Sequence, residues 1–275
     1  MEGKTNFFKF QLLLKDMKKY GVDKNGFIIT EVGLNKIKPA FKKVLDTIKD
    51  EVIIKFGDEI HSLYLYGSVA TGKARIKSSD LDLLLVLHRK PTSKIKNEVT
   101  KFQNYLTSEH LGIFRDVGIS LTHANEVKKD IYGYGCFIKH LCVCLAGENL
   151  GKNLPNFKPS KKVAKAFNGD IEKHIKTVLK QLKSTHTLQE VRSICSGTMR
   201  KIVRTGFCLV MEQEQSWTTD LKKSYEIFSK YYPKQSVDMK KALTLAQKPT
   251  TNTKELEKFL EDFGSWLSEE VEKKL

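Results

Sequence analysis

Two carboxylates are the side chains in this sequence best placed to do chemistry. Asp80 and Asp82 stand two positions apart, at the start of an aliphatic run that ends at Leu87. In a strand, alternate side chains point to the same face, so both carboxylates would face the same way. Two carboxylates this close repel each other unless a divalent cation lies between them, and oxygen ligands favour Mg²⁺ or Mn²⁺. The spacing therefore predicts a metal site that could act on a phosphate.

A glycine turn comes shortly before the acidic pair. Gly67 and Ser68 follow the β-prone run 61–66, and Asp80 comes 12 residues after Ser68. Glycine lets backbone N–H groups approach a ligand closely, and the serine adds a hydroxyl donor beside a turn that favours phosphate. Lys73, in the loop between the two, could contact a triphosphate or an RNA backbone, and a solvated loop residue is the alternative. Each pair alone would read as an ordinary turn or a solvated strand, but the combination favours a nucleotide site.

As a unit, these residues resemble the signature of the nucleotidyltransferase superfamily typified by DNA polymerase beta. The resemblance rests on Gly67-Ser68 and on Asp80-Leu81-Asp82-Leu83. Ser68 after the glycine, Gly72 four residues on and Ser78-Ser79 before the acidic pair together make it similar to the minimal and antibiotic-adenylylating branches. It implies a small mixed sheet with helices and two Mg²⁺ ions. It also implies transfer of a nucleoside monophosphate, from ATP as the expected donor, to a hydroxyl with release of pyrophosphate. Ser79 then joins the candidates for nucleotide binding.

Members of that superfamily need a third carboxylate from a neighbouring strand, as metal ligand or as base. The best match is Asp116, within the strand candidate 113–122, and Glu126 is the alternative. Alternatively, Asp116 has a structural role and forms an ion pair with its neighbour Arg115. Gly118 interrupts the hydrophobic pattern, so the register of this strand stays open.

The elements that must position these residues follow from hydrophobic periodicity. Residues 1–128 are predicted to form a nucleotidyltransferase catalytic domain with N-terminal helices, and residues 129–275 a C-terminal helical bundle, which makes the fold class α+β. In the first part, we expect helices over the first 20 residues, 36–56 and 92–109, and strands over 61–66, 81–87 and 113–122. In the second part, we expect helices near 131–146, 160–183, 187–212, 218–231 and 253–274.

The charge points to an anionic partner. The chain has 48 Lys and Arg against 32 Asp and Glu, a formal net charge of +16, and residues 151–210 carry 13 basic side chains against three acidic ones. A nucleoside triphosphate fits this balance, and so does RNA, such as tRNA, bound through residues 151–210. In antibiotic nucleotidyltransferases, basic residues of the helical bundle reach the nucleotide's phosphates. Arg200 and Arg204, four residues apart, match that role by resemblance, and a solvated basic face is the alternative.

The acceptor stays open between RNA and an aminoglycoside-like small molecule. A polycationic drug fits a protein of this charge less well, whereas the resemblance to the antibiotic branch favours one. A protein hydroxyl is a third acceptor, and a catalytically inactive, RNA-binding module is the alternative to an enzyme. No apolar run is long enough for a membrane span, no signal peptide is seen, and five cysteines favour free thiols in the cytoplasm.

Overall fold

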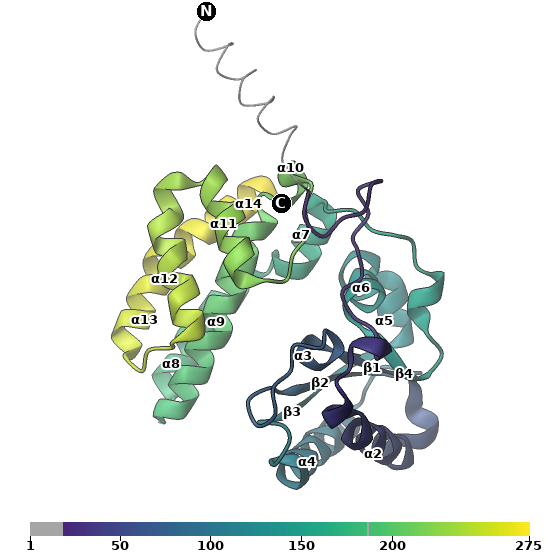
Figure 1. The fold of residues 1–275 in the computed structure, drawn as a ribbon. Helices are drawn as coiled ribbons and strands as arrows, with labels where there is room; N and C mark the ends of the chain where they lie inside the picture. Colours follow the sequence, from purple (N-terminus) through teal and green to yellow (C-terminus); the bar gives the residue numbers. More distant parts are fainter. Residues whose placement is uncertain (1–18, 186) are drawn as a thin grey trace, which may run out of the picture. The chain divides into compact units, whose positions relative to one another are not determined.

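The computed structural model describes residues 19–185 and 187–275, and the helix expected over the first 20 residues lies almost wholly outside these ranges. Within them the chain forms two compact units, residues 29–157 and residues 19–28 with 158–275 (Figure 1). No helix in the described ranges is long and apolar enough to cross a membrane. All five cysteines are free thiols, as expected.

The first unit, called the sheet unit, is built on four strands in the order β3-β2-β1-β4. β2 pairs antiparallel with β1 and parallel with β3, and β1 pairs antiparallel with β4, so the sheet is mixed. The strands are β1 (Ile60–Tyr66), β2 (Leu81–Leu87), β3 (Val117–His123) and β4 (Val143–Gly147). A small mixed sheet followed by helices confirms the α+β class.

Helices cover both faces of this sheet (Figure 1). On one face, α2 (Pro39–Phe56) and α4 (Ser93–His110) pack on alternate strand residues such as Leu63 and Leu83. On the other face, α5 (Ala124–Lys129) and α6 (Cys136–Leu141) form a second core with Tyr64, Leu84 and Val86. Shorter turns complete the unit: η1 (Leu34–Lys36), η2 (Gly57–Glu59), α3 (Gly67–Ala70), η3 (Ile131–Gly135) and η4 (Leu150–Asn153). Because β2 is buried on both faces, it can be aliphatic from Leu83 to Leu87.

The helix expected near 131–146 is wrong in its second half. α6 ends at Leu141, and residues 143–147 form β4, where Val143 pairs with Leu65 of β1. This pairing covers an edge of β1 that would otherwise expose unpaired backbone groups. The sheet unit, which includes β4, runs to Phe157.

The second unit, called the helical unit, is helical from residue 161 to 274, as predicted. The expected helix 160–183 is two helices that break near Gly169, and one helix, α12, has no counterpart among the expected segments. The helices are α7 (Lys161–Asn168), α8 (Ile171–Ser184), α9 (Leu188–Cys208), α10 (Met211–Glu214), α11 (Leu221–Tyr231), α12 (Ser236–Gln247), α13 (Thr253–Phe259) and α14 (Ser265–Lys274), with η5 (Pro233–Gln235) and η6 (Leu260–Gly264). Within the unit, α9 packs against α7, α8, α11 and α12. Residue 20 joins it through the backbone, since Trp217 N donates to Tyr20 O at 2.8 Å.

Candidate functional site

The glycine turn and the second aspartate meet at one edge of the sheet. Tyr66, the last residue of β1, pairs with Asp82 in β2, so the turn begins beside that carboxylate. Gly67 has a φ of +73°, and a Cβ built on it would lie 2.2 Å from Asp82 Oδ2. A side chain at position 67 would meet both backbone strain and a clash, so the turn needs glycine. The two halves of the sequence motif are therefore in contact.

Backbone hydrogen bonds hold this turn closely. The carbonyl oxygen of Ser68 accepts from Lys73 N at 2.9 Å and from Ala74 N at 3.1 Å. The hydroxyl of Thr71 donates to Gly67 O at 3.1 Å. The side chain of Ser68 is half-buried, whereas Lys73 is exposed. These bonds hold the backbone of Lys73 next to Ser68, which follows the glycine in contact with Asp82.

The first aspartate is engaged by an arginine. Arg115 donates from Nε to Asp80 Oδ1 at 2.9 Å and from Nη2 to Asp80 Oδ2 at 2.6 Å, a bidentate ion pair. Arg115 N also donates to Ser79 O at 3.0 Å, and Ser79 Oγ accepts from Arg75 N at 3.0 Å. These bonds tie the loop before β2 to the segment before β3. Arg115 therefore pairs with Asp80 and not with its chain neighbour Asp116.

The third predicted carboxylate has its own partners. Asp116 is exposed and precedes β3, and its Oδ1 accepts from Thr107 Oγ1 at 3.0 Å and from Val117 N at 2.8 Å. The parallel register pairs Asp82 with Gly118. A Cβ built on Gly118 would lie 3.9 Å from Asp82 Oδ1, in ordinary contact. The β3 residue that faces Asp82 is thus a glycine, and Asp116 stays a predicted ligand.

Glu126, the alternative, lies toward the opposite end of the strand. His123 at the end of β3 pairs with Leu87, five residues along β2 from Asp82, or about 16 Å at the usual rise per strand residue. Glu126 follows His123 in the first turn of α5. Over residues 19–185 and 187–275, no group of three His, Cys, Asp or Glu side chains is arranged to hold a metal ion.

A tyrosine that the sequence did not single out lies on the same face as Asp82. The hydroxyl of Tyr66 is 3.1 Å from Ser120 Oγ, and its ring packs edge-on against Phe137 of α6. Burial, and then the carboxylate of Asp82, raise the pKa of Tyr66 above its usual value. Its hydroxyl is therefore neutral near pH 7 and can position a group but not take a proton. Alternation along β1 from Tyr64 to Tyr66 is the signal that could have found it.

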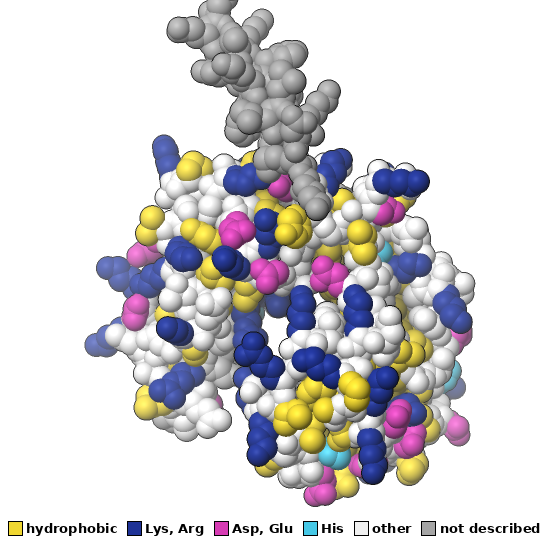
Figure 2. All heavy atoms as spheres, viewed as in Figure 1, with side chains coloured by type: hydrophobic (Ala, Val, Ile, Leu, Met, Phe, Trp, Pro, Cys, Tyr) yellow, Lys and Arg dark blue, Asp and Glu magenta, His cyan; other side chains and the backbone are white. Residues whose placement is uncertain are grey.

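The two predicted phosphate contacts in the second half lie on α9. Arg200 and Arg204 are exposed and four residues apart, within the helical unit. Figure 2 shows Lys and Arg side chains at many places on the viewed face, with acidic side chains among them. The nucleotide-binding role of Arg200 and Arg204 stays a prediction.

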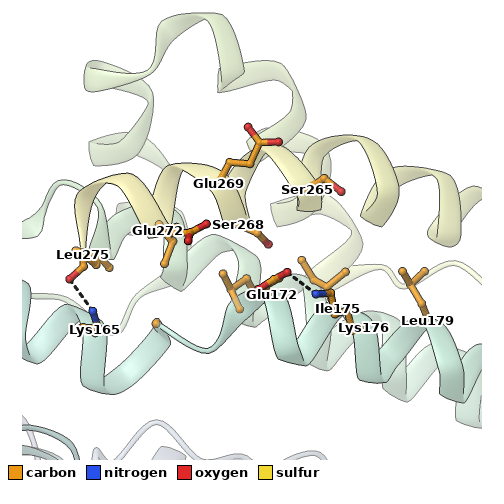
Figure 3. A pocket seen from close by; sticks show the side chains of 13 residues that line it. Lys165, Glu172, Ile175, Lys176, Leu179, Ser265, Ser268, Glu269, Glu272 and Leu275 are labelled. Atoms are coloured by element: carbon orange, nitrogen blue, oxygen red, sulfur yellow. Dashed lines mark hydrogen bonds and ion pairs between the residues drawn. The ribbon is translucent and has the colours of Figure 1, made fainter.

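The helical unit also has an open pocket of about 550 Å³ between α8 and α14 (Figure 3). Its wall mixes apolar side chains such as Ile175 with charges of both signs, and Glu172 pairs with Lys176 there. Lys165 of α7 closes one end by donating to Leu275 O at 3.2 Å. None of the residues predicted to do chemistry lines this pocket, so the candidate site is the edge of the sheet.

Comparisons with known proteins agree with this location. Residues 47–138 match the family described as polymerase beta, nucleotidyltransferase, a range that contains the glycine turn, both aspartates and β3. No curated protein matches the chain. Among solved structures, the chain is similar to spectinomycin adenyltransferase AAD(9) from Enterococcus faecialis, crystallised with ATP and spectinomycin. The TM-score is 0.51 at 12% identity, over 84% of this chain and 98% of that one. This share exceeds the sheet unit, so the likeness in fold extends into the helical unit.

Proposed function

Starting from the polymerase-beta-like nucleotidyltransferase domain of this chain, we propose that the protein transfers a nucleoside monophosphate from a Mg²⁺–nucleoside triphosphate to an acceptor hydroxyl, releasing pyrophosphate. ATP is the expected donor. One observation carries the proposal: Gly67 has no room for a Cβ because its turn lies against the carboxylate of Asp82. A turn of this kind beside a metal-binding carboxylate brings phosphate and cation together.

The residues at the sheet edge then have distinct parts. The β- and γ-phosphates would lie on the turn Gly67–Ser68, with Lys73 and Ser79 nearby along the loop. Asp80 and Asp82 would hold the divalent cation, which would neutralise charge that develops at the α-phosphate. Since such catalysis is mostly positioning and electrostatics, a turn held by backbone hydrogen bonds suits it.

The two carboxylates fit a nucleotide-bound Mg²⁺. This ion is usually held by one or two carboxylates together with substrate phosphates, not by a complete cage of protein ligands. Asp80 directly precedes β2 and Asp82 is its second residue, so a spacing of two would place both carboxylates on the same side if the extended backbone continues through Asp80. Mn²⁺ prefers similar oxygen ligands and would serve as a probe.

The charge of the protein suggests which acceptor receives the nucleotide. The formal charge of +16 and the basic region 151–210 favour an RNA acceptor, tRNA included. The solved structure with the similar fold was crystallised with spectinomycin, which keeps an aminoglycoside-like acceptor as the second candidate. Protein hydroxyls are a third candidate acceptor. If the protein transfers no nucleotide, an inactive RNA-binding module is the alternative function.

The test is label transfer. The purified protein is incubated with Mg²⁺, each α-labelled nucleoside triphosphate and a total cell extract, and the products are separated into RNA, protein and small molecules. Label in one fraction, absent with the double variant Asp80→Ala and Asp82→Ala, would support transfer and identify the acceptor class. Label in RNA supports the charge argument, and label only on added aminoglycosides supports the second candidate. No label with any nucleotide, in extract or with aminoglycosides, would overturn the proposal.

A further inference from the structure

We propose that this site works with a single divalent cation and that the Arg115 guanidinium supplies the positive charge that a second cation would bring. The inference rests on the proposed function and concerns the same edge of the sheet. It starts from two observations: the glycine that faces Asp82 on β3, and the arginine that pairs with Asp80.

Position 118 is where a third carboxylate would have to stand to share an ion with Asp82. β2 and β3 are parallel and in register there, so the side chain at 118 projects from the same face of the sheet as Asp82. A Cβ at this position would have only Asp82 Oδ1 and Leu81 O within 4 Å, both at 3.9 Å. The space is open to a carboxylate, and the sequence places none in it.

Asp116 does not supply the carboxylate that is missing opposite Asp82. Its Oδ1 accepts two hydrogen bonds, one from Thr107 of α4 and one from the amide that opens β3. In the register of the sheet it lies level with Asp80, two residues short of the position that faces Asp82. A second cation near Asp82 would therefore have no carboxylate from β3.

Arg115 brings a positive charge to Asp80, the first carboxylate of the acidic pair. Its two bonds use one lone pair on each oxygen of Asp80, and a carboxylate has about four such sites, so Asp80 can still bind a cation. Arginine stays protonated at any physiological pH and binds carboxylates with a fixed geometry. The guanidinium is thus a permanent charge held next to the metal-binding carboxylate.

A site with two cations and a site with one cation plus Arg115 would have the same net charge. Three carboxylates with two divalent cations leave one net positive charge. Asp80 and Asp82 with one divalent cation and the Arg115 guanidinium leave the same net charge, counted without Asp116, whose Oδ1 accepts from Thr107 Oγ1 and Val117 N. The absence of a carboxylate at position 118 and the presence of an arginine at Asp80 therefore compensate each other in net charge. Arg115 acts through Asp80, which makes it a positioning residue.

The test counts bound metal ions. Mn²⁺ is titrated into the protein with adenosine 5′-(α,β-methylene)triphosphate, which cannot undergo transfer, and free Mn²⁺ is measured by electron paramagnetic resonance. The wild type is expected to hold one Mn²⁺ per chain beyond that bound by free nucleotide. The double variant Gly118→Asp with Arg115→Ala is expected to hold two, the second at least about tenfold more tightly than any second ion in the wild type. Gly112→Asp with Arg115→Ala is the matched control, because a Cβ at Gly112 meets nothing within 4 Å and the added charge lies elsewhere.

The outcomes separate this inference from the proposed function. One ion in the wild type and two in the Gly118 variant, but not in the Gly112 control, supports it. Two ions in the wild type would overturn the inference and leave nucleotidyl transfer standing. No ion and no nucleotide bound by the wild type would count against both. A second readout is transfer itself: Arg115→Ala should lower the rate at least about tenfold, and Arg115→Lys should restore part of it.

Discussion

The sheet unit and the helical unit carry their charged side chains in different ways. In the sheet unit, Asp80 and Asp82 come from one segment and Arg115 from another, and Arg115 forms a bidentate ion pair with Asp80. In the helical unit, lysines and arginines follow exposed faces of α8 and α9, while Ile175 and Val178 are buried on the other face of α8. Convergence of charges from several elements is costly unless it serves binding, whereas an amphipathic helix needs no ligand to explain its polar face. We therefore expect any chemistry at the sheet edge, and the polar faces of α8 and α9 need no ligand to explain them.

The largest effect should come from the aspartate beside the turn. Asp82→Asn keeps the shape of the side chain but removes the negative charge needed for the cation. We expect transfer to fall at least about a hundredfold, with Mg²⁺-dependent nucleotide binding lost. The measurement is the rate of label transfer, with circular dichroism to show that the variant folds. A variant that folds and transfers at the wild-type rate would place the chemistry elsewhere.

The glycine turn gives the next effect. Gly67→Ala adds a Cβ that would lie 2.2 Å from Asp82 Oδ2, on a backbone with φ of +73°. We expect nucleotide affinity to fall, together with a loss of about 1–3 kcal/mol in the free energy of unfolding. Gly57→Ala is the control: it also has positive φ, +42°, but its Cβ would meet nothing within 4 Å. Equal loss of nucleotide affinity in both variants would mean that contact with Asp82 is irrelevant.

A buried histidine gives the sheet unit a pH dependence unrelated to the site. His140 Nε2 accepts from Phe157 N at 3.4 Å, and its Nδ1 lies 3.2 Å from Thr30 Oγ1, so the ring is held neutral. Burial lowers its pKa to about 4, from an ordinary value of 6.5. Between these values the unfolded chain binds a proton that the folded chain does not, so stability falls as the pH drops from 7 to 5. His140 should account for about 1–2 kcal/mol of that loss.

The measurement is urea unfolding at pH 7 and pH 5, comparing the wild type with His140→Gln. The variant should lose less stability than the wild type over this range, because glutamine does not titrate. Identical losses in the two proteins would contradict the neutral, buried state of His140.

The smallest effect should come from α9. If Arg200 and Arg204 reach the triphosphate, Arg200→Ala with Arg204→Ala should weaken ATP binding about fivefold, as expected for exposed charges. Lys254→Ala with Lys258→Ala is the control, since these two exposed lysines of α13 are also four residues apart. Equal affinity in the two double variants would reduce Arg200 and Arg204 to a solvated surface.

Sequence reasoning predicted the parts of the molecule that local chemistry determines. The strand at 60–66 follows from a β-prone run and the strand at 81–87 from an aliphatic run, and the end of β1 follows from Gly67. The helix α2 is marked by Pro39 in its first turn and Gly57 after its end. The contact between Gly67 and Asp82 agrees with the motif that these residues make together.

The rest depends on pairing between segments far apart in the chain. β4 is a run of five residues, Val143–Gly147, and periodicity cannot tell so short an apolar run from the end of a helix. The partner of Arg115 and the residue that faces Asp82 follow from the register of β2 and β3, which one chain's pattern does not fix. For the same reason, Gly118 is visible in the sequence only as an irregularity in the strand pattern, and Asp116 stays a prediction.

Calorimetric titration of ATP tests the central claim most directly. ATP is added to the wild type and to Asp82→Asn, each with Mg²⁺ and with the ion removed by a chelator. If the sheet edge is a metal–nucleotide site, heat of binding should be seen only with wild type and Mg²⁺ together. Equal binding by the wild type without the ion, or by the Asp82 variant with it, would contradict the claim that this carboxylate holds the cation of the nucleotide.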